Sequence, residues 1–125
     1  MNDIIISIID IQKRLIMAKT SPYESGELTD SIFLILISTI TPIHGYRIMQ
    51  KIKKMTDNNI NIGPATMYTT LKKMKSAKWI CETDEEDGKI LYQITEKGRE
   101  ILFADYEKKK SIVEIAEKEL NDKHE

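Results

Sequence analysis

The sequence has few residues of the kinds that build covalent cross-links, metal sites or catalytic centres. Its one cysteine, Cys81, cannot form a disulfide within the chain or a metal site built from cysteines. The two histidines, His44 and His124, are too few for a transition-metal site, and the sequence has no glycine-rich phosphate loop and no nucleophile–histidine grouping. We therefore predict no metal, no cofactor and no enzymatic activity, in a protein of the reducing cytoplasm.

Glycine, proline and long hydrophobic runs are also scarce. With 5 glycines and 3 prolines in 125 residues, the chain has little material for the many turns of an all-β fold. No run approaches the roughly 18 apolar residues that span a bilayer. Asp3 and Asp10 interrupt the isoleucine-rich N-terminus, which argues against a signal peptide. We expect a mostly α-helical globular protein without a membrane partner.

The charge is unevenly distributed, although the net charge is only −1. Residues 44–81 carry eight lysines and arginines against one carboxylate, Asp57, which gives this stretch a local charge of +7. A field of this kind attracts phosphate groups. Its position indicates which part of the chain would bind a nucleic acid.

The stretch 63–80 carries the clearest functional pattern. Met67, Leu71 and Met74 have helical spacing and predict one buried stripe. The opposite face is short, polar and cationic, and this helix contains no carboxylate; the residues are Ala65, Thr66, Tyr68, Thr69, Lys72, Lys73 and Ser76. A face of one charge sign suggests a polyanion as partner.

A β-hairpin should follow this helix directly. We predict a strand over residues 79–83, a turn over 84–89 that contains Asp87-Gly88, and a return strand over 89–95 with Ile90, Tyr92 and Ile94 on one face. A helix that leads into a hairpin is the second half of a winged helix.

Two helices are expected before this pair. Thr29 or Asp30 should cap the first, which is apolar nearly all round, is predicted to be the central core helix and ends near Thr41 before Pro42. The next opens at residues 44–46 and is expected to turn Tyr46, Met49, Ile52 and Met55 inward. The alternation of residues 60–62 suggests one short strand.

The two ends of the chain predict amphipathic helices. Residues 2–19 carry a broad apolar face that includes Ile4, Ile8, Ile11 and Leu15. Thr95 should cap a long final helix, along which heptad-like spacing places Leu102, Tyr106, Val113, Ala116 and Leu120 on one seam, broken at Lys109. We predict that these two sets of residues form a dimer interface.

Three motifs in this order resemble the PadR family of bacterial transcriptional regulators, in its short form. They are His44-Gly45-Tyr46-Arg47-Ile48, the helix from Ala65 to Met74, and Tyr92-Gln93-Ile94-Thr95-Glu96-Lys97-Gly98. The resemblance covers roughly residues 28–102. It implies a winged helix-turn-helix, homodimers joined by the terminal helices, operator DNA as partner, and repression relieved by a small hydrophobic effector. The matched DNA-facing positions are Thr66, Tyr68, Thr69, Lys72, Lys73 and, in the wing, Lys89.

The chain departs from the family pattern in three places. Lys78 stands where the family usually has glycine, so it must adopt a left-handed conformation at a cost of about 1 kcal/mol or the helix must end differently. In the wing, Lys89 is alone among five carboxylates of residues 82–87, so the wing stays off the DNA or serves another purpose. Lys109 breaks the apolar seam of the final helix, and a continuous apolar pore for an effector does not follow from the sequence.

We therefore predict a dimerisation helix over residues 1–20, a DNA-binding domain over 28–95 and a second dimerisation helix over 96–123. The predicted function is that of a homodimeric DNA-binding regulator, most simply a repressor. The alternative is a winged-helix module that binds a protein instead of DNA, through its acidic hairpin and its N-terminal apolar face. The +7 stretch argues against this alternative.

Overall fold

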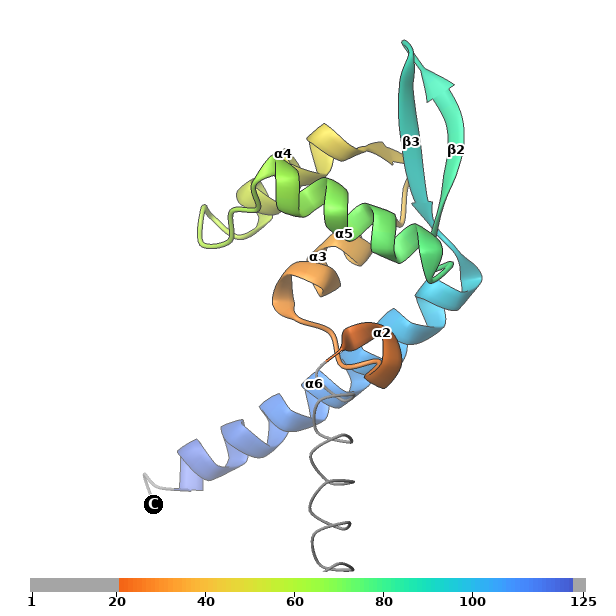
Figure 1. Ribbon diagram of the computed structural model, residues 1–125. Coiled ribbons are helices and arrows are strands. Elements are labelled where there is room, and N and C mark those ends of the chain that lie inside the picture. Colours follow the sequence, from red (N-terminus) through yellow and green to blue (C-terminus); the bar gives the residue numbers. More distant parts are fainter. Residues whose placement is uncertain (1–20, 123–125) are drawn as a thin grey trace, which may run out of the picture.

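The computed structural model describes residues 21–122 of the chain, of which residues 84–86 by their backbone only. Figure 1 shows helices gathered into a bundle, with a hairpin projecting from one end and the C-terminal half of the last helix from the other. The three strands form one antiparallel sheet in the order β1-β3-β2. The elements are α2 (Pro22–Ser25), α3 (Asp30–Ser38), β1 (Ile43–His44), α4 (Gly45–Met55), α5 (Pro64–Ser76), β2 (Ile80–Glu86), β3 (Lys89–Ile94) and α6 (Glu96–Asp122).

The hydrophobic core lies where α4 packs against α3 on one side and α5 on the other. The side chains of the predicted stripe are at most 1% exposed, which confirms the predicted helix; they are those of Met67, Leu71 and Met74. Burial of these side chains removes apolar surface from water and fixes which face of α5 is left outside. The rest of the buried cluster is Leu28, Ile35, Leu36, Ile48, Ile52, Ile62, Trp79, Ile80, Ile94 and Leu102.

Both predicted threonine caps are confirmed. The Thr29 hydroxyl accepts a hydrogen bond from the Ile32 N–H at 3.2 Å and starts α3, and the Thr95 hydroxyl accepts one from the Gly98 N–H at 3.0 Å and starts α6. Each satisfies a backbone donor that the first helical turn leaves without a partner. Helix α3 ends at Ser38, earlier than predicted.

The prediction for α4 was wrong about Tyr46, which is 57% exposed, and Met55, which is 44% exposed. The buried positions are Ile48 and Ile52, which are four residues apart and lie on the same face. The apolar stripe of α4 is therefore rotated relative to the prediction, and Tyr46 is left on the solvent side.

The third strand is not where the sequence placed it. Residues 60–62 form no strand: the Ile60 N–H donates to the Thr56 hydroxyl at 3.1 Å, and that hydroxyl donates back to the Ile52 carbonyl of α4 at 2.8 Å. Instead β1 pairs with β3, with Ile43 opposite Tyr92 and His44 opposite Leu91. This pairing joins the start of α4 to the hairpin.

The hairpin turn is confirmed, but its first strand is longer than predicted, and its return strand ends one residue earlier, at Ile94. Asp87 has a φ of 54° and Gly88 a φ of 74°. Positive φ at both central residues is the requirement of the tight turns that join two twisted strands. Residues 84–86 consequently belong to β2 and not to the turn.

Helix α5 ends in a left-handed residue, which is one of the two outcomes that the sequence left open. Lys78 has a φ of 64°. The Trp79 N–H donates to the Met74 carbonyl at 2.9 Å and the Lys78 N–H donates to the Lys75 carbonyl at 3.0 Å. This pair of bonds is the Schellman arrangement, which ordinarily has glycine at the left-handed position.

Candidate nucleic-acid interface

The structure brings the predicted residues of α5 together on one exposed surface. Thr66, Tyr68, Thr69, Lys72 and Lys73 are all exposed, whereas the stripe on the opposite side is buried. The first turn of α5 contains no acidic residue, and its last turn is basic. This surface can therefore donate hydrogen bonds and attract anions along the whole length of the helix.

Tyr68 is partly packed against the protein and partly exposed. Its side chain is 48% exposed. One edge of its ring lies against the first residue of α4, Gly45. The approach is so close that a Cβ placed on Gly45 would lie only 2.9 Å from Tyr68 Cε1. Gly45 therefore admits the ring, and packing of the ring on α4 limits the orientations of the phenol that remains exposed.

Lys75 is directed at the wing. Its Nζ donates to the Glu82 carboxylate on β2 at 2.9 Å, and this hydrogen bond raises the pKa of Lys75 above its ordinary value. Lys75 is thus engaged by a carboxylate within the same chain. Lys75 therefore contributes less positive potential around α5 than a count of the charges in residues 44–81 implied. The same ion pair neutralises one of the five carboxylates of the wing.

Lys89 lies in a second basic region that the sequence did not predict as a unit. A cleft of about 340 Å³ between β1, α4 and the hairpin is lined by Lys89, Arg47 and His44, with Asp87 at its edge. His44 Nδ1 lies 3.4 Å from the Ile90 carbonyl oxygen. Pairing of β1 with β3 creates this cleft. That pairing was not predicted from the sequence, and Arg47 was therefore not included among the DNA-facing residues.

The end of the hairpin is joined closely to α6. A Cβ on Gly98 would lie 2.1 Å from the Trp79 carbonyl oxygen, so only glycine fits at this position. The Thr95 hydroxyl also donates to the Lys78 carbonyl at 2.6 Å. These contacts bring the end of α5, the base of the hairpin and the first turn of α6 together.

The sequence model of the family described as "Transcriptional regulator PadR-like family" matches residues 33–104. This match spans more than half of the chain and contains α4, α5, the hairpin and the two close-packed glycines. The chain belongs to the PadR-like family of transcriptional regulators. No curated protein matches it significantly.

Solved structures of other transcriptional regulators have the same fold. A transcriptional regulator from Clostridium thermocellum aligns with a TM-score of 0.62 at 22% identity, over 70% of this chain and 87% of that one. A PadR family regulator from Eggerthella lenta aligns with a TM-score of 0.58 at 19% identity, over 95% and 94%. One from Clostridium difficile aligns with a TM-score of 0.59 at 21% identity, over 71% and 97%. The predicted winged helix-turn-helix is therefore confirmed.

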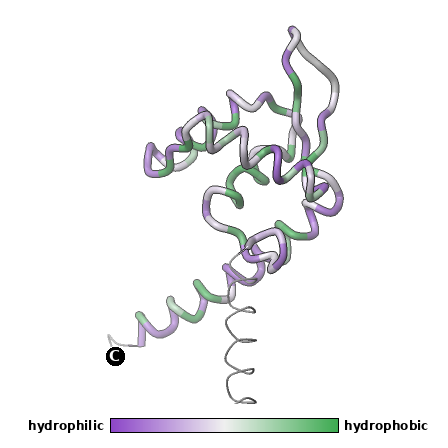
Figure 2. The backbone as a smooth tube through the Cα atoms, viewed as in Figure 1, coloured by the Kyte–Doolittle hydropathy of each residue, from purple (hydrophilic) through white to green (hydrophobic). Residues whose placement is uncertain are grey.

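The predicted dimer residues of this PadR-like chain fall into different environments. Ile4, Ile8, Ile11 and Leu15 lie outside the described residues. Leu102 is 7% exposed and packs in the core of its own subunit, so it does not belong to the exposed seam. Tyr106, Val113, Ala116 and Leu120 are exposed, and so are three apolar residues that the seam omitted, Phe103, Ile112 and Ile115. Figure 2 shows hydrophobic and hydrophilic residues recurring along this part of α6.

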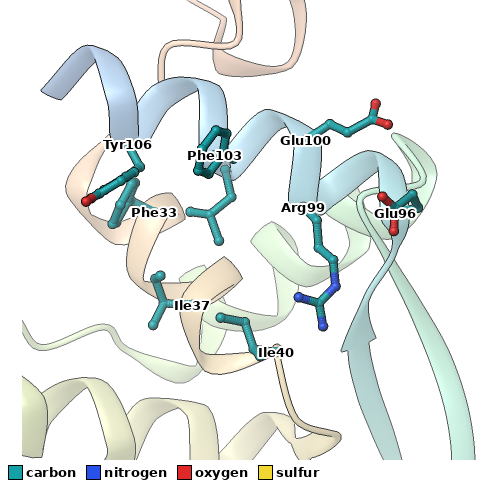
Figure 3. Close-up of a pocket in the computed structure, with 9 residues that line it drawn as sticks. Phe33, Ile37, Ile40, Glu96, Arg99, Glu100, Phe103 and Tyr106 are labelled. Atoms are coloured by element: carbon teal, nitrogen blue, oxygen red, sulfur yellow. The ribbon is translucent and has the colours of Figure 1, made fainter. Parts of the chain in front are cut away.

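An apolar groove of about 490 Å³ separates α3 from the first half of α6. In Figure 3, Phe33, Ile37 and Ile40 of the α3 side face Phe103 and Tyr106 of α6. The other end of the groove is lined by the charged residues Glu96, Arg99 and Glu100, and the Arg99 guanidinium is directed toward Ile40. The groove opens to solvent beside the exposed apolar residues of α6.

The described part of the chain offers little for other chemistry. Among residues 21–83 and 87–122, no three histidine, cysteine, aspartate or glutamate side chains gather in a way that could hold a metal ion. No helix within the same range is both long and apolar enough to cross a membrane.

Proposed function

We propose that the chain is a homodimeric DNA-binding repressor that is released from its operator by a small hydrophobic effector. The observation that carries the DNA-binding part is the exposed face of α5, which has five hydrogen-bonding or cationic positions within one helical stretch and no carboxylate. A helix of this kind fits the major groove, where its side chains reach base edges and phosphates.

Different residues have different roles in this proposal. Thr66 and Thr69 contact base edges, and Tyr68 contacts a phosphate or sugar. Lys72 and Lys73 contact phosphates and supply affinity that is largely independent of sequence. Lys89 and Arg47 contact the flanking backbone from the cleft beside the hairpin.

The homodimer part is supported by the apolar side chains that α6 leaves exposed. Residues 110–122 are exposed throughout, and they include Ile112, Val113, Ile115 and Leu120. A contiguous apolar surface of this kind marks an interaction site on a protein that otherwise buries its hydrophobic residues. A second copy that covers it would place two recognition helices on one duplex, with the N-terminal residues of the predicted interface as a further contribution.

The effector part is supported by the groove between α3 and α6. Its volume of about 490 Å³ and its aromatic lining suit a small hydrophobic molecule. The groove is lined by α3 of the DNA-binding domain, by Ile40 just after it and by α6, so an occupant that favours one angle between α3 and α6 would change DNA affinity.

A salt titration of binding to pooled random duplex DNA, with the mass in solution measured alongside, tests this function. We expect a dimer whose affinity falls steeply as salt rises. Lys72→Ala should weaken binding and reduce the salt slope by about one. Lys118→Ala is the matched control, because Lys118 is equally exposed but lies far along α6.

The opposite results would separate the alternatives. A dimer without DNA affinity even at low salt would exclude the regulator mechanism proposed here and favour the protein-binding module. A monomer that binds DNA would support the DNA-binding surface on α5 and exclude the homodimer. An unchanged salt slope for Lys72→Ala would remove Lys72 from the interface.

A further inference from the structure

A buried carboxylate on α6 holds the segment at which the DNA-binding helices begin. Asp105 is 4% exposed, although it is charged and lies on a helix that is largely exposed. Its Oδ1 accepts a hydrogen bond from the Leu28 N–H at 3.3 Å, and its other oxygen pairs with Lys109 Nζ. Leu28 immediately precedes Thr29, the cap of α3, so this contact fixes the start of α3 on α6.

Lys109 completes the contact from the same side. Its Nζ also donates to the Leu28 carbonyl at 3.0 Å and lies 5.2 Å from the centroid of the Phe33 ring. Both backbone groups of Leu28 are therefore bound by side chains of α6. The lysine that breaks the apolar heptad pattern is used within its own subunit. We call the set of Leu28, Asp105 and Lys109 the α6 clamp.

A clamp of this chemistry fixes an angle better than an apolar contact does. Burying a charged pair costs desolvation free energy, so such a pair is weak evidence of a stabilising role. Hydrogen bonds are directional, however, whereas apolar contacts allow helices to slide and tilt. Two hydrogen bonds, one to the N–H and one to the carbonyl of the same residue, specify how α6 leaves the DNA-binding domain.

The angle matters because α6 extends well beyond the clamp. Residues 110–122 are exposed, and this length of helix is about 20 Å at 1.5 Å per residue. A tilt of about 10° at the clamp would move the helix end by about 3.5 Å, close to one base-pair step. In a two-fold dimer the tilts of both subunits contribute.

We infer that Asp105 and Lys109 are positioning residues that set the spacing between the two DNA half-sites that a dimer can occupy. This inference rests on the proposed function, since spacing has meaning only for a dimer on DNA. Neither residue touches the DNA. They act by fixing the angle between α6 and the helix bundle, and hence the separation of the two copies of α5.

The first test is binding to a set of duplexes in which two selected half-sites are separated by spacers that differ by single base pairs. The wild-type protein should prefer one spacing by about tenfold over its neighbours, because half-site separation is geometric. Asp105→Asn and Lys109→Met should each reduce that preference to about threefold or less, with affinity for a single half-site unchanged. Lys108→Met is the matched control, because Lys108 pairs with Glu27 on the exposed side of the same turn.

A merely structural role would have a different signature. Variants that lower the melting temperature but keep the wild-type spacing preference would overturn the inference. Asp105→Asn keeps the volume and an acceptor oxygen for Leu28, and Lys109→Met keeps the apolar stem. If Asp105→Asn does not fold, Lys109→Met decides, because the Lys109 side chain is 36% exposed and tolerates change better.

A second measurement without DNA keeps this test separate from the proposed function. Spin labels at Ser76→Cys and Lys118→Cys, with Cys81→Ser, report the distance between α5 and the projecting half of α6. The distance distribution should broaden in both clamp variants and stay narrow in Lys108→Met. Unchanged distributions in both clamp variants would overturn the inference whether or not the protein binds DNA. Failure of the wild-type protein to bind DNA would overturn the proposed function and the spacing role together. The spin-label distances would then test only whether the α6 clamp fixes the angle between α6 and the helix bundle.

Discussion

Replacing Lys78 by glycine is expected to stabilise the protein. Lys78 ends α5 with a φ of 64°, a conformation in which its Cβ crowds the backbone. That crowding costs about 1–2 kcal/mol for an L-residue. Glycine removes this cost but gives the unfolded chain more freedom, which offsets about 0.4–1 kcal/mol. The net gain in the free energy of unfolding should be about 0.5–1 kcal/mol, which raises the melting temperature by about 2–5 °C for a chain of this length.

Two further variants separate the backbone effect from the loss of charge. Lys78→Ala removes the same charge and keeps the strained backbone, so its stability should stay close to that of the wild type. Lys78→Asn should fall between alanine and glycine, because asparagine tolerates the left-handed region. The hydrogen bond from the Thr95 hydroxyl goes to the backbone carbonyl of residue 78 and is available in every variant.

Urea unfolding followed by circular dichroism measures the order of these variants. All should be compared at one protein concentration, since dimerisation makes apparent stability concentration-dependent. The midpoint should shift while the slope with denaturant stays constant. Equal stabilities of the glycine and alanine variants, or a less stable glycine variant, would show that the strain assigned to residue 78 is absent.

Two other changes test the packing and the charges of the interface. Gly98→Ala should destabilise the fold by about 3 kcal/mol or more, because the new Cβ would overlap a backbone carbonyl that cannot move aside. Gly63→Ala is the control, because its Cβ would meet nothing within 4 Å. Equal urea midpoints for the two variants would contradict the close approach at Gly98. Lys75→Ala should change the salt slope of DNA binding less than Lys72→Ala, because Glu82 already pairs with Lys75; equal slopes would mean that the ion pair opens on DNA.

The helices and the hairpin turn could be predicted because their signals are local. The stripe of Met67, Leu71 and Met74 needs only helical periodicity, and Asp87-Gly88 needs only the backbone freedom of a tight turn. The exposed side of α5 follows automatically, since burying one face of a helix leaves the other outside. The predicted DNA-facing residues of α5 are accessible for this reason.

Errors arose where a contact across the chain competed with a local pattern. The alternation of residues 60–62 suggested a strand, but the Ile60 N–H donates to the Thr56 hydroxyl instead. The real partner of the hairpin, residues 43–44, is too short to carry a pattern of its own. Leu102 fits the heptad seam by spacing, yet it packs in the subunit core.

The sequence alone determined the order of helices α3 to α6 and of the hairpin, the cationic face of α5, the threonine caps and the family. These depend on side chains a few residues apart, whose relative positions are set by helix and turn geometry. Only the tertiary structure decided which charges are available. It pairs Lys75 with Glu82, joins Arg47 to Lys89 in one cleft, and uses Lys109 in the α6 clamp. These outcomes depend on which distant segments meet, and charge interactions act through space without regard to separation along the chain.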